Sequence, residues 1–557
     1  FLFSESDGPA AERKPNEYRK TFIALANDRS SPDETFLESP AGRAAVLSTV
    51  PEHLRSRAPK ELSPDERRAL ERARRALRSR RAANHLEVYG IPPTLSVLER
   101  RMEEDAAKTC YASVNLDALR RLDFEITFQN RDQAHRDYAE AMEDAGRVTE
   151  KAAGTARPVA DTSPPLEPVA RLERYRRGQL RLAAVRATQA RLECEGLLPP
   201  GSRHRPGAFD LATHTALAEF EKKNDIFGWG FIAGETHAAL LRPSPALHFE
   251  TFRRILAERL SDAAGILEDG SVSKGGSPAT WVDASGVVRP VPNLIGDFVD
   301  ALLRGLRIET PEDLARFLRE VGPGGFASLR VAFAAPPLPE YYGRVMDLSV
   351  EIDRGDVWYD PPFDEIGSPV VQRRDRYPSF TLFVRWREQK IPLVRWRTTI
   401  GSWRSELHDD ARLYLKYKNS DVGPRIWKSI VAAPVWVPPA ATPGRDLVVR
   451  KVFDPRQGPV TVVNTEVMGP GFASAYGLGM AIHLKKLPDG GLFDNLIRTH
   501  GSVDYTSIAR RFSHGCHRLV NNRAVRLFGF VLKHRSFDRM GSRSLRGFRR
   551  KLHHEGA

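Results

Sequence analysis

Cys516 is the residue whose type and surroundings are best suited to covalent chemistry. It is one of three cysteines and lies in the segment SHGCHR (residues 513–518), sixteen residues after His500. A thiolate attacks carbonyl carbon well, and an imidazole within reach can take the proton of the thiol. We therefore expect Cys516 to be a nucleophile and His500 to be the base that generates its thiolate, which fits several kinds of Cys/His chemistry.

The neighbours of Cys516 are small or charged, which suits the same chemistry. Gly515 lets the chain bend tightly, so that backbone N–H groups around the cysteine can face a developing oxyanion. Ser513 could hold the loop or an imidazole by a hydrogen bond. Arg518 could orient the loop or bind a substrate carboxylate with two guanidinium nitrogens. Four further residues of the two motif halves are expected to contact substrate, namely Gly501, Ser502, Tyr505 and His514.

His483 is a second candidate for the base, because it ends an apolar, strand-like run. We prefer His500, since a glycine and a small hydroxyl residue follow it. Four residues of the region are metal ligands by type, namely His500, His514, Cys516 and His517. Neighbours in one tight loop rarely converge on a single ion, so we expect neither a metal nor a cofactor.

The chain before Cys516 has the pattern of strands that could position it. Apolar and polar residues alternate over 380–386, and a second such run covers 391–396. A helix is predicted after the cysteine, with Asn521 or Asn522 as its cap. The reactive segment is therefore expected between a strand-rich region and a helix that anchors it.

Residues 181–242 form another unit with a pattern of its own. Three short helices are predicted, with glycine-containing turns between them and a threonine cap on two of the three. The composition of 157–168, which is rich in proline, is that of a linker.

Two families resemble parts of this chain. The pair HGS (500–502) and SHGCHR (513–518) is similar to the active-site signature of the L,D-transpeptidases, the YkuD-type domain that cross-links peptidoglycan. Residues 181–242 resemble the helical peptidoglycan-binding domain often attached to cell-wall enzymes. Three positions depart from these patterns: His517 replaces an aliphatic residue, Ala509 a glycine, and Glu221 a glutamine.

The first resemblance implies a reaction. The carbonyl of the diamino-acid residue of a tetrapeptide stem would acylate Cys516 and release D-alanine. The side-chain amine of a second stem would then take the acyl group, which gives a 3–3 cross-link. Peptidoglycan would be the partner, and the periplasm or cell envelope the location. The alternatives are a Cys/His peptidoglycan hydrolase or carboxypeptidase, in which water replaces the amine, and a non-catalytic wall-binding scaffold.

At 557 residues the chain is too long for one hydrophobic core, and we expect a multidomain α+β protein. The predicted parts are a mostly helical, Arg-rich region over 1–150, a Pro-rich linker and helix over 151–180, the peptidoglycan-binding-like module over 181–242, a helical or mixed region of unknown role over 243–340, the β-rich catalytic domain over 341–535 and a basic tail over 536–557.

The net charge and the number of cysteines indicate which partners and which compartment to expect. The net charge of +14 fits an anionic wall polymer, nucleic acid or an Arg-rich surface. No zinc-finger spacing or RNA-binding signature accompanies it, so nucleic acid is not expected. The chain begins at Phe1, and a signal or membrane anchor could have preceded it. Cys110 and Cys194 could form a disulfide in an oxidising compartment or remain two buried thiols.

Overall fold

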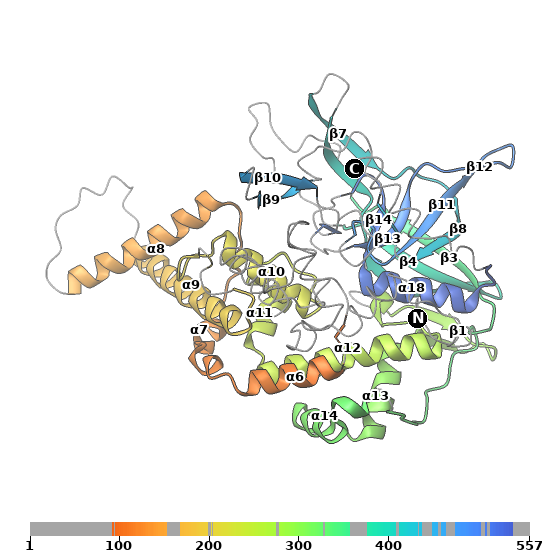
Figure 1. Ribbon diagram of the computed structural model, residues 1–557, viewed down its shortest axis with the longest axis horizontal. Coiled ribbons are helices and arrows are strands. Elements are labelled where there is room, and N and C mark those ends of the chain that lie inside the picture. The colour runs from red at the N-terminus through yellow and green to blue at the C-terminus, as the bar shows by residue number, and fades with distance from the viewer. Residues whose placement is uncertain are drawn as a thin grey trace, which may run out of the picture. The chain divides into compact units, whose positions relative to one another are not determined.

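The computed structural model (Figure 1) describes residues 92–93, 95–152, 168–198, 202, 204–273, 278–326, 329–356, 376–407, 412–432, 434–436, 448–454, 458–463, 474–502, 507–508 and 513–538. These residues combine helices with several small, mostly antiparallel sheets, which confirms a mixed helical and strand-containing protein. The chain divides into two compact units. The helical unit contains Pro93–His248 and the mixed unit contains Phe249–Ala557.

The helical unit consists of short and medium helices around one apolar core. In chain order these are α6 (Leu95–Ala106), η4 (Cys110–Ser113), α7 (Leu116–Arg120), α8 (Arg131–Ala152), α9 (Pro168–Cys194), α10 (Leu211–Lys223), α11 (Gly234–Leu241) and the first residues of α12 (Ser244–Ala264). Leu119 and Ile126 share this core with Val185, Leu217 and Phe220. The region before residue 150 and the module at 181–242 are therefore not separate folding cores.

Three helices fall within 181–242, but their ends differ from the prediction. α9 begins at Pro168, so the predicted boundary at 180 lies inside a helix. Asp210 caps α10 by accepting the N–H of Thr213 at 2.9 Å, and the N-cap of α11 is Ala233, which makes no side-chain cap bond. The predicted threonine caps are therefore wrong for α10 and α11. A carboxylate is a better acceptor at a helix start than the threonine three residues on.

Glu221, the departure noted in this module, is fully buried and holds the turn before α11. One carboxylate oxygen accepts the N–H of Gly230 and the other accepts the hydroxyl of Thr236, both at 2.7 Å. A glutamate can accept two bonds at once without using a donor. The substitution therefore fits the local hydrogen bonding of this chain.

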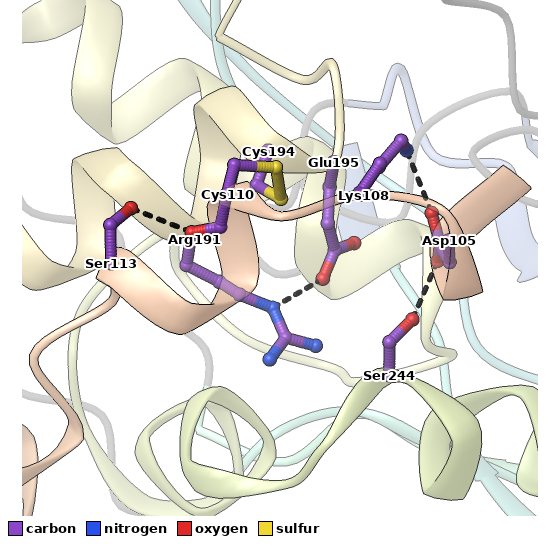
Figure 2. Close-up of a disulfide and its surroundings, with 8 residues drawn as sticks. All are labelled: Asp105, Lys108, Cys110, Ser113, Arg191, Cys194, Glu195 and Ser244. Carbon is purple, nitrogen blue, oxygen red and sulfur yellow. Dashed lines mark hydrogen bonds and ion pairs between the residues drawn. A yellow bond between two sulfur atoms is a disulfide. The ribbon is translucent and has the colours of Figure 1, made fainter.

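The structure joins Cys110 and Cys194 in a disulfide, with a Cα–Cα distance of 5.7 Å (Figure 2). The bond links η4 to the end of α9. Next to it, the buried Glu195 binds Arg191 at 2.6 Å and Lys223 at 2.7 Å. Burial raises the pKa of Glu195, but these two cations outweigh burial and hold it below its usual value. The disulfide therefore lies next to a buried carboxylate whose charge is balanced by two cations.

Removing this disulfide should destabilise the helical unit. The bond closes a sequence separation of 84 residues, and the loss of chain entropy in the unfolded state that such a loop implies is about 4.6 kcal/mol. In a Cys516→Ala background, we expect the double variant Cys110→Ser/Cys194→Ser to lose about that much free energy of unfolding in denaturant titrations followed by circular dichroism. An unchanged unfolding midpoint would contradict a stabilising disulfide.

The mixed unit contains the remaining elements. They are η5 (Ser271–Ser273), β1 (Thr280–Val282), β2 (Val288–Pro290), α13 (Leu294–Leu306), α14 (Pro311–Gly325), β3 (Asp347–Asp353), β4 (Ser379–Trp386), β5 (Gln389–Arg397), β6 (Gly401–Leu407), β7 (Leu413–Asn419), β8 (Arg425–Ala432), β9 (Val448–Asp454), β10 (Gly458–Val463), β11 (Gly479–Lys486), β12 (Leu492–Phe493), β13 (Arg498–Ser502), β14 (His517–Val520) and α18 (Asn521–His534).

Two sheets of the mixed unit matter for the site. β3, β4 and β5 form an antiparallel sheet, which confirms the strands predicted over 380–386 and 391–396. The other sheet has the order β12-β11-β13-β14, with β8 also paired to β11. Within it β13 and β14 are parallel, while the other pairs are antiparallel.

One core joins these sheets to α18 and to segments before residue 341. Phe380 and Trp396 of the first sheet, Leu519 of β14 and Phe528 of α18 belong to it, and so does Trp281 of β1. The predicted boundary at 340 therefore does not separate two cores. Proline-rich composition at 334–339 marks an extended connection and does not show which surfaces pack together.

The predicted helix after the cysteine is α18, and its cap differs from the prediction. The N-cap residue is Val520, which makes no side-chain cap bond. The side chain of Asn521 instead accepts the N–H of Leu478 at 3.0 Å. Asn521 is fully buried, so this bond fastens the start of α18 to the chain that enters β11. Of the helices in the described segments, none is both long and apolar enough to cross a membrane.

Candidate active site

The parallel pairing of β13 and β14 brings together residues that are distant in the sequence. The register places His500 opposite Arg518 and Thr499 opposite His517. Cys516 directly precedes β14. Because side chains alternate between the two faces of a strand, His500 and Arg518 project from one face, and Thr499 and His517 project from the other. The charge of Arg518 acts on both His500 and Cys516, so the predicted nucleophile, base and cation lie near one another.

Gly515 has a backbone conformation that other residues avoid. Its φ is +110°, and a Cβ there would lie 2.8 Å from Cδ1 of Ile497 and 3.1 Å from the carbonyl carbon of Asn419. Ser513 is fully buried and holds the same turn: its hydroxyl donates to the carbonyl of Cys516 at 2.9 Å and accepts the N–H of Gly515 at 3.2 Å. Ser513 therefore holds the loop by hydrogen bonds, as predicted. One of these bonds occupies the N–H of Gly515.

The thiol of Cys516 lies in a partly closed environment. Its Sγ is 3.7 Å from the carbonyl oxygen of Leu496, to which it donates. Burial raises the pKa of the thiol, while the backbone N–H of Arg498 and the charge of Arg518 partly oppose that rise. At neutral pH the resting group is consequently the neutral thiol.

Leu496 has a conformation that is uncommon for a residue with a side chain. Its φ is +63°, and its side chain is 70% exposed beside the nucleophile. Asp494 stabilises this turn by accepting the N–H of Leu496 at 2.8 Å. The guanidinium of Arg498 binds the same carboxylate through two nitrogens, at 2.7 and 2.8 Å. A bidentate ion pair thus supports the carbonyl that meets the thiol.

His500 is buried, with 1% of its surface exposed. Its Nδ1 lies 2.5 Å from the carbonyl oxygen of Gly501. A carbonyl only accepts, so Nδ1 carries the hydrogen and Nε2 of the neutral ring is left able to take a proton. Burial, and then the charge of Arg518, lower the pKa of His500 to about 3. The ring of Tyr476 packs edge-on against this imidazole, with 4.8 Å between centroids.

His483, the alternative base, lies on the other face of the sheet. Its Nε2 is 2.9 Å from the hydroxyl of Thr499, which is adjacent to His500 in β13 and therefore points the opposite way. Its ring stacks on Trp427 and packs against His517, with centroid distances of 5.6 and 5.4 Å. Burial lowers its pKa to about 3. This geometry favours His500 as the base.

The remaining predicted positions have different environments. His517 is buried on the face of His483, and burial lowers its pKa to about 4. The histidine at position 517, where the resembling pattern has an aliphatic residue, therefore lies on the face of the sheet opposite His500. His514 is exposed beside the nucleophile. Tyr505 and Ala509 lie outside the described residues.

Gly501 and Ser502 are both buried. A Cβ on Gly501 would lie 2.3 Å from Oδ1 of Asn521, so glycine is needed for the close approach of β13 to the start of α18. The hydroxyl of Ser502 is 3.0 Å from that of Ser507. These contacts are structural, and a substrate contact for Gly501 or Ser502 stays a prediction.

Sequence reasoning missed two groups at this site. Thr398 and Thr399 hydrogen-bond the backbone of Cys516 and Arg518, and Tyr476 packs on His500. Burial, and then the charge of Cys516, raise the pKa of Tyr476 to about 12. The threonines precede the nucleophile by more than a hundred positions. A pair of threonines at a strand end does not indicate a functional role, because threonine is common in strands.

Among the described residues, no group of three or more histidine, cysteine, aspartate or glutamate side chains is placed to hold a metal ion. Comparison of the chain with protein-family models, curated proteins and solved structures finds no match. A functional assignment therefore depends on the residues of the site and on how the sheet arranges them.

Proposed function

We propose that this protein is a cysteine acyltransferase of the L,D-transpeptidase type that acts on the stem peptides of peptidoglycan. The observation that supports it most is the parallel β13–β14 register, which places His500 opposite Arg518, two residues after Cys516. A nucleophile, a base with an available nitrogen and a fixed cation are the groups that such acyl transfer needs. The similarity of both motif halves to the family signature supplies the substrate class.

The resting pair is neutral in this proposal. Burial keeps Cys516 as a thiol and His500 as an uncharged imidazole. Arg518 acts on both: its charge favours the thiolate but disfavours the imidazolium. A substrate carboxylate bound to Arg518 would offset that charge at the histidine, and so raise its basicity when substrate is present.

Acylation proceeds by proton transfer from the thiol to Nε2 of His500 and attack of sulfur on the carbonyl of the diamino-acid residue. The carbon–nitrogen bond to D-alanine breaks, and its amine takes the proton from the imidazolium. We assign the N–H of Cys516 as the hydrogen-bond donor to the oxyanion, because the N–H of Gly515 already donates to Ser513. An acceptor amine then attacks the thioester, His500 takes its proton, and the thiol is regenerated.

Three further observations support peptidoglycan as the partner and the cell envelope as the location. The Cys110–Cys194 disulfide is typical of proteins that fold in an oxidising compartment. The helices α9 to α11 occupy the segment that resembles a wall-binding domain, and the net charge of +14 suits an anionic polymer. No cofactor takes part in the proposed reaction.

Products formed from purified tetrapeptide muropeptides test this proposal. We expect a cross-linked dimer that has lost one D-alanine, identified by liquid chromatography and mass spectrometry. Tripeptide without dimer would instead assign the site to a hydrolase or carboxypeptidase, in which water takes the acyl group. If neither product forms while Cys516→Ala and wild-type protein bind sacculi equally, the chain is a wall-binding scaffold.

A further inference from the structure

Two buried threonines at the junction of β5 and β6 contact the backbone of the nucleophile loop. Thr399 is fully buried, and its hydroxyl donates to the carbonyl of Cys516 at 2.7 Å and accepts the N–H of Arg518 at 3.3 Å. Thr398 is 2% exposed, and its hydroxyl donates to the carbonyl of Arg518 at 3.0 Å. The two hydroxyls therefore bind successive peptide groups that follow Cys516, and they contact the backbone of the loop and not its side chains.

The carbonyl of Cys516 receives two hydroxyl donors. Ser513 donates at 2.9 Å from within the loop, and Thr399 donates from a different strand connection. A carbonyl oxygen has two lone pairs, so these two bonds use its full accepting capacity. Together they hold the peptide plane that follows Cys516, and with it the direction of the Cα–Cβ bond that carries the thiol.

The junction that carries the threonines is itself held against the loop. The carbonyl of Ile400 accepts the N–H of Ser420 at 2.8 Å. Gly515 packs closely on the same segment, because a Cβ there would lie 3.1 Å from the nitrogen of Ser420. The residue that follows β7 therefore contacts both the junction and the tight turn before the nucleophile. These contacts fix the backbone that carries the hydroxyl of Thr399.

We propose that Thr399 is a positioning residue for the nucleophile: its hydroxyl fastens the peptide groups of Cys516 and Arg518 to the β5–β6 junction and so aims the thiol. The consequence for catalysis depends on the proposed acyl transfer, but the effect on the thiol itself does not. Thr398 supports the same arrangement from the next peptide group. Misplacement of a reacting group by about 1 Å can cost about a hundredfold in rate.

Loss of the hydroxyl should move two rates in opposite directions. Without the hydroxyl of Thr399, the loop keeps Ser513 and the bond from Thr398 to the carbonyl of Arg518 but loses its link from the junction to the carbonyl of Cys516, and we expect the thiol to become more hydrated. Burial raises the pKa of Cys516, so hydration lowers it and speeds reaction with a small neutral reagent. Acyl transfer slows at the same time, because the thiol is no longer held toward His500. Unfolding would also expose the thiol, so both rates are measured at a temperature where the variant is fully folded.

The experiment compares Thr399→Val, which keeps the shape but removes the hydroxyl, with Thr399→Ser, which keeps the hydroxyl. Thr381→Val is the matched control, since Thr381 is a buried threonine of β4. Alkylation by iodoacetamide is followed against pH, and Cys516 is the only free cysteine of the three. We expect Thr399→Val to be alkylated several-fold faster, with its pH profile moved to lower pH, and kcat for cross-linking to fall about tenfold or more with KM little changed.

Thr399→Ser and Thr381→Val should both behave as wild type in both assays. The proposal is overturned if Thr399→Val matches wild type in its alkylation profile. It is also overturned if the faster alkylation of Thr399→Val and its slower cross-linking are both accounted for by the unfolded fraction, measured by thermal unfolding under the same conditions. If wild-type protein forms no cross-link, the proposed function fails, and the alkylation profiles of the valine and serine variants still decide whether Thr399 positions the thiol.

Discussion

Cys516→Ala is expected to abolish acylation of the protein by stem peptides, with a fall in rate of about 10⁴-fold or more. The other two cysteines are joined in a disulfide, so the variant retains no thiol that could form the thioester. Intact-mass spectrometry after incubation with a tetrapeptide muropeptide or a carbapenem measures the adduct directly. Wild-type protein should gain one acyl group, and a digest should locate it at Cys516.

Cys516→Ser is the companion variant. It retains a hydroxyl at nearly the same place, but an alcohol is a far weaker nucleophile than a thiolate at neutral pH. It should therefore bind stem peptides like wild type and form product slowly or not at all. An adduct of normal yield on Cys516→Ala would show that the nucleophile is a different residue, and the proposed mechanism would have to be abandoned.

His500→Gln is expected to lower the rate of acylation about 10²-fold to 10⁴-fold at neutral pH. Glutamine can donate to the carbonyl of Gly501 as Nδ1 does, but it cannot take a proton from the thiol. The matched control is His483→Gln, which retains a partner for Thr499 on the opposite face of the sheet. We expect the control to stay within a few-fold of wild type, measured as the initial rate of adduct formation.

The pH dependence of His500→Gln provides a second check. Because burial places the pKa of His500 near 3, the imidazole is neutral and able to act as a base throughout the range above about pH 4. Wild-type acylation should therefore show no acidic limb from this histidine between pH 5 and 8. The pKa of Cys516 is raised, so thiolate forms without help only at alkaline pH. The deficit of the variant should shrink as pH rises, and a deficit constant with pH would argue against a base.

Local patterns predicted helices better than helix ends. The periodicity after Cys516 predicted α18, and the module at 181–242 contains helices where they were expected. The caps were wrong, because the side chain of Asn521 bonds to Leu478, which is distant in sequence, and Asp210 rather than a threonine binds the first turn of α10. Capping depends on which acceptor lies nearest to the free N–H groups, and distant segments compete for the same side chain.

Domain boundaries could not be read from composition. The break at 180 lies within α9, and the one at 340 lies within a single core that joins Trp281 to Phe380 and Phe528. Proline-rich composition carries no information on which apolar faces pack together, because burial depends on the positions of elements far apart in the chain.

Residue types and short spacings in the sequence predicted which reactive groups this protein has: a thiol at Cys516, a histidine sixteen residues before it, a glycine directly before it and an arginine two residues after it. The rest followed from the folded structure. The parallel pairing of β13 and β14 put His500 opposite Arg518, while His483 bonds Thr499 on the other face of β13. Helix packing joined Cys110 to Cys194, and the β5–β6 junction brought Thr399 to the nucleophile loop. The physical reason is that pairing and packing set the face and the neighbours of a side chain, and the residues concerned lie from 16 to 117 positions apart in the sequence.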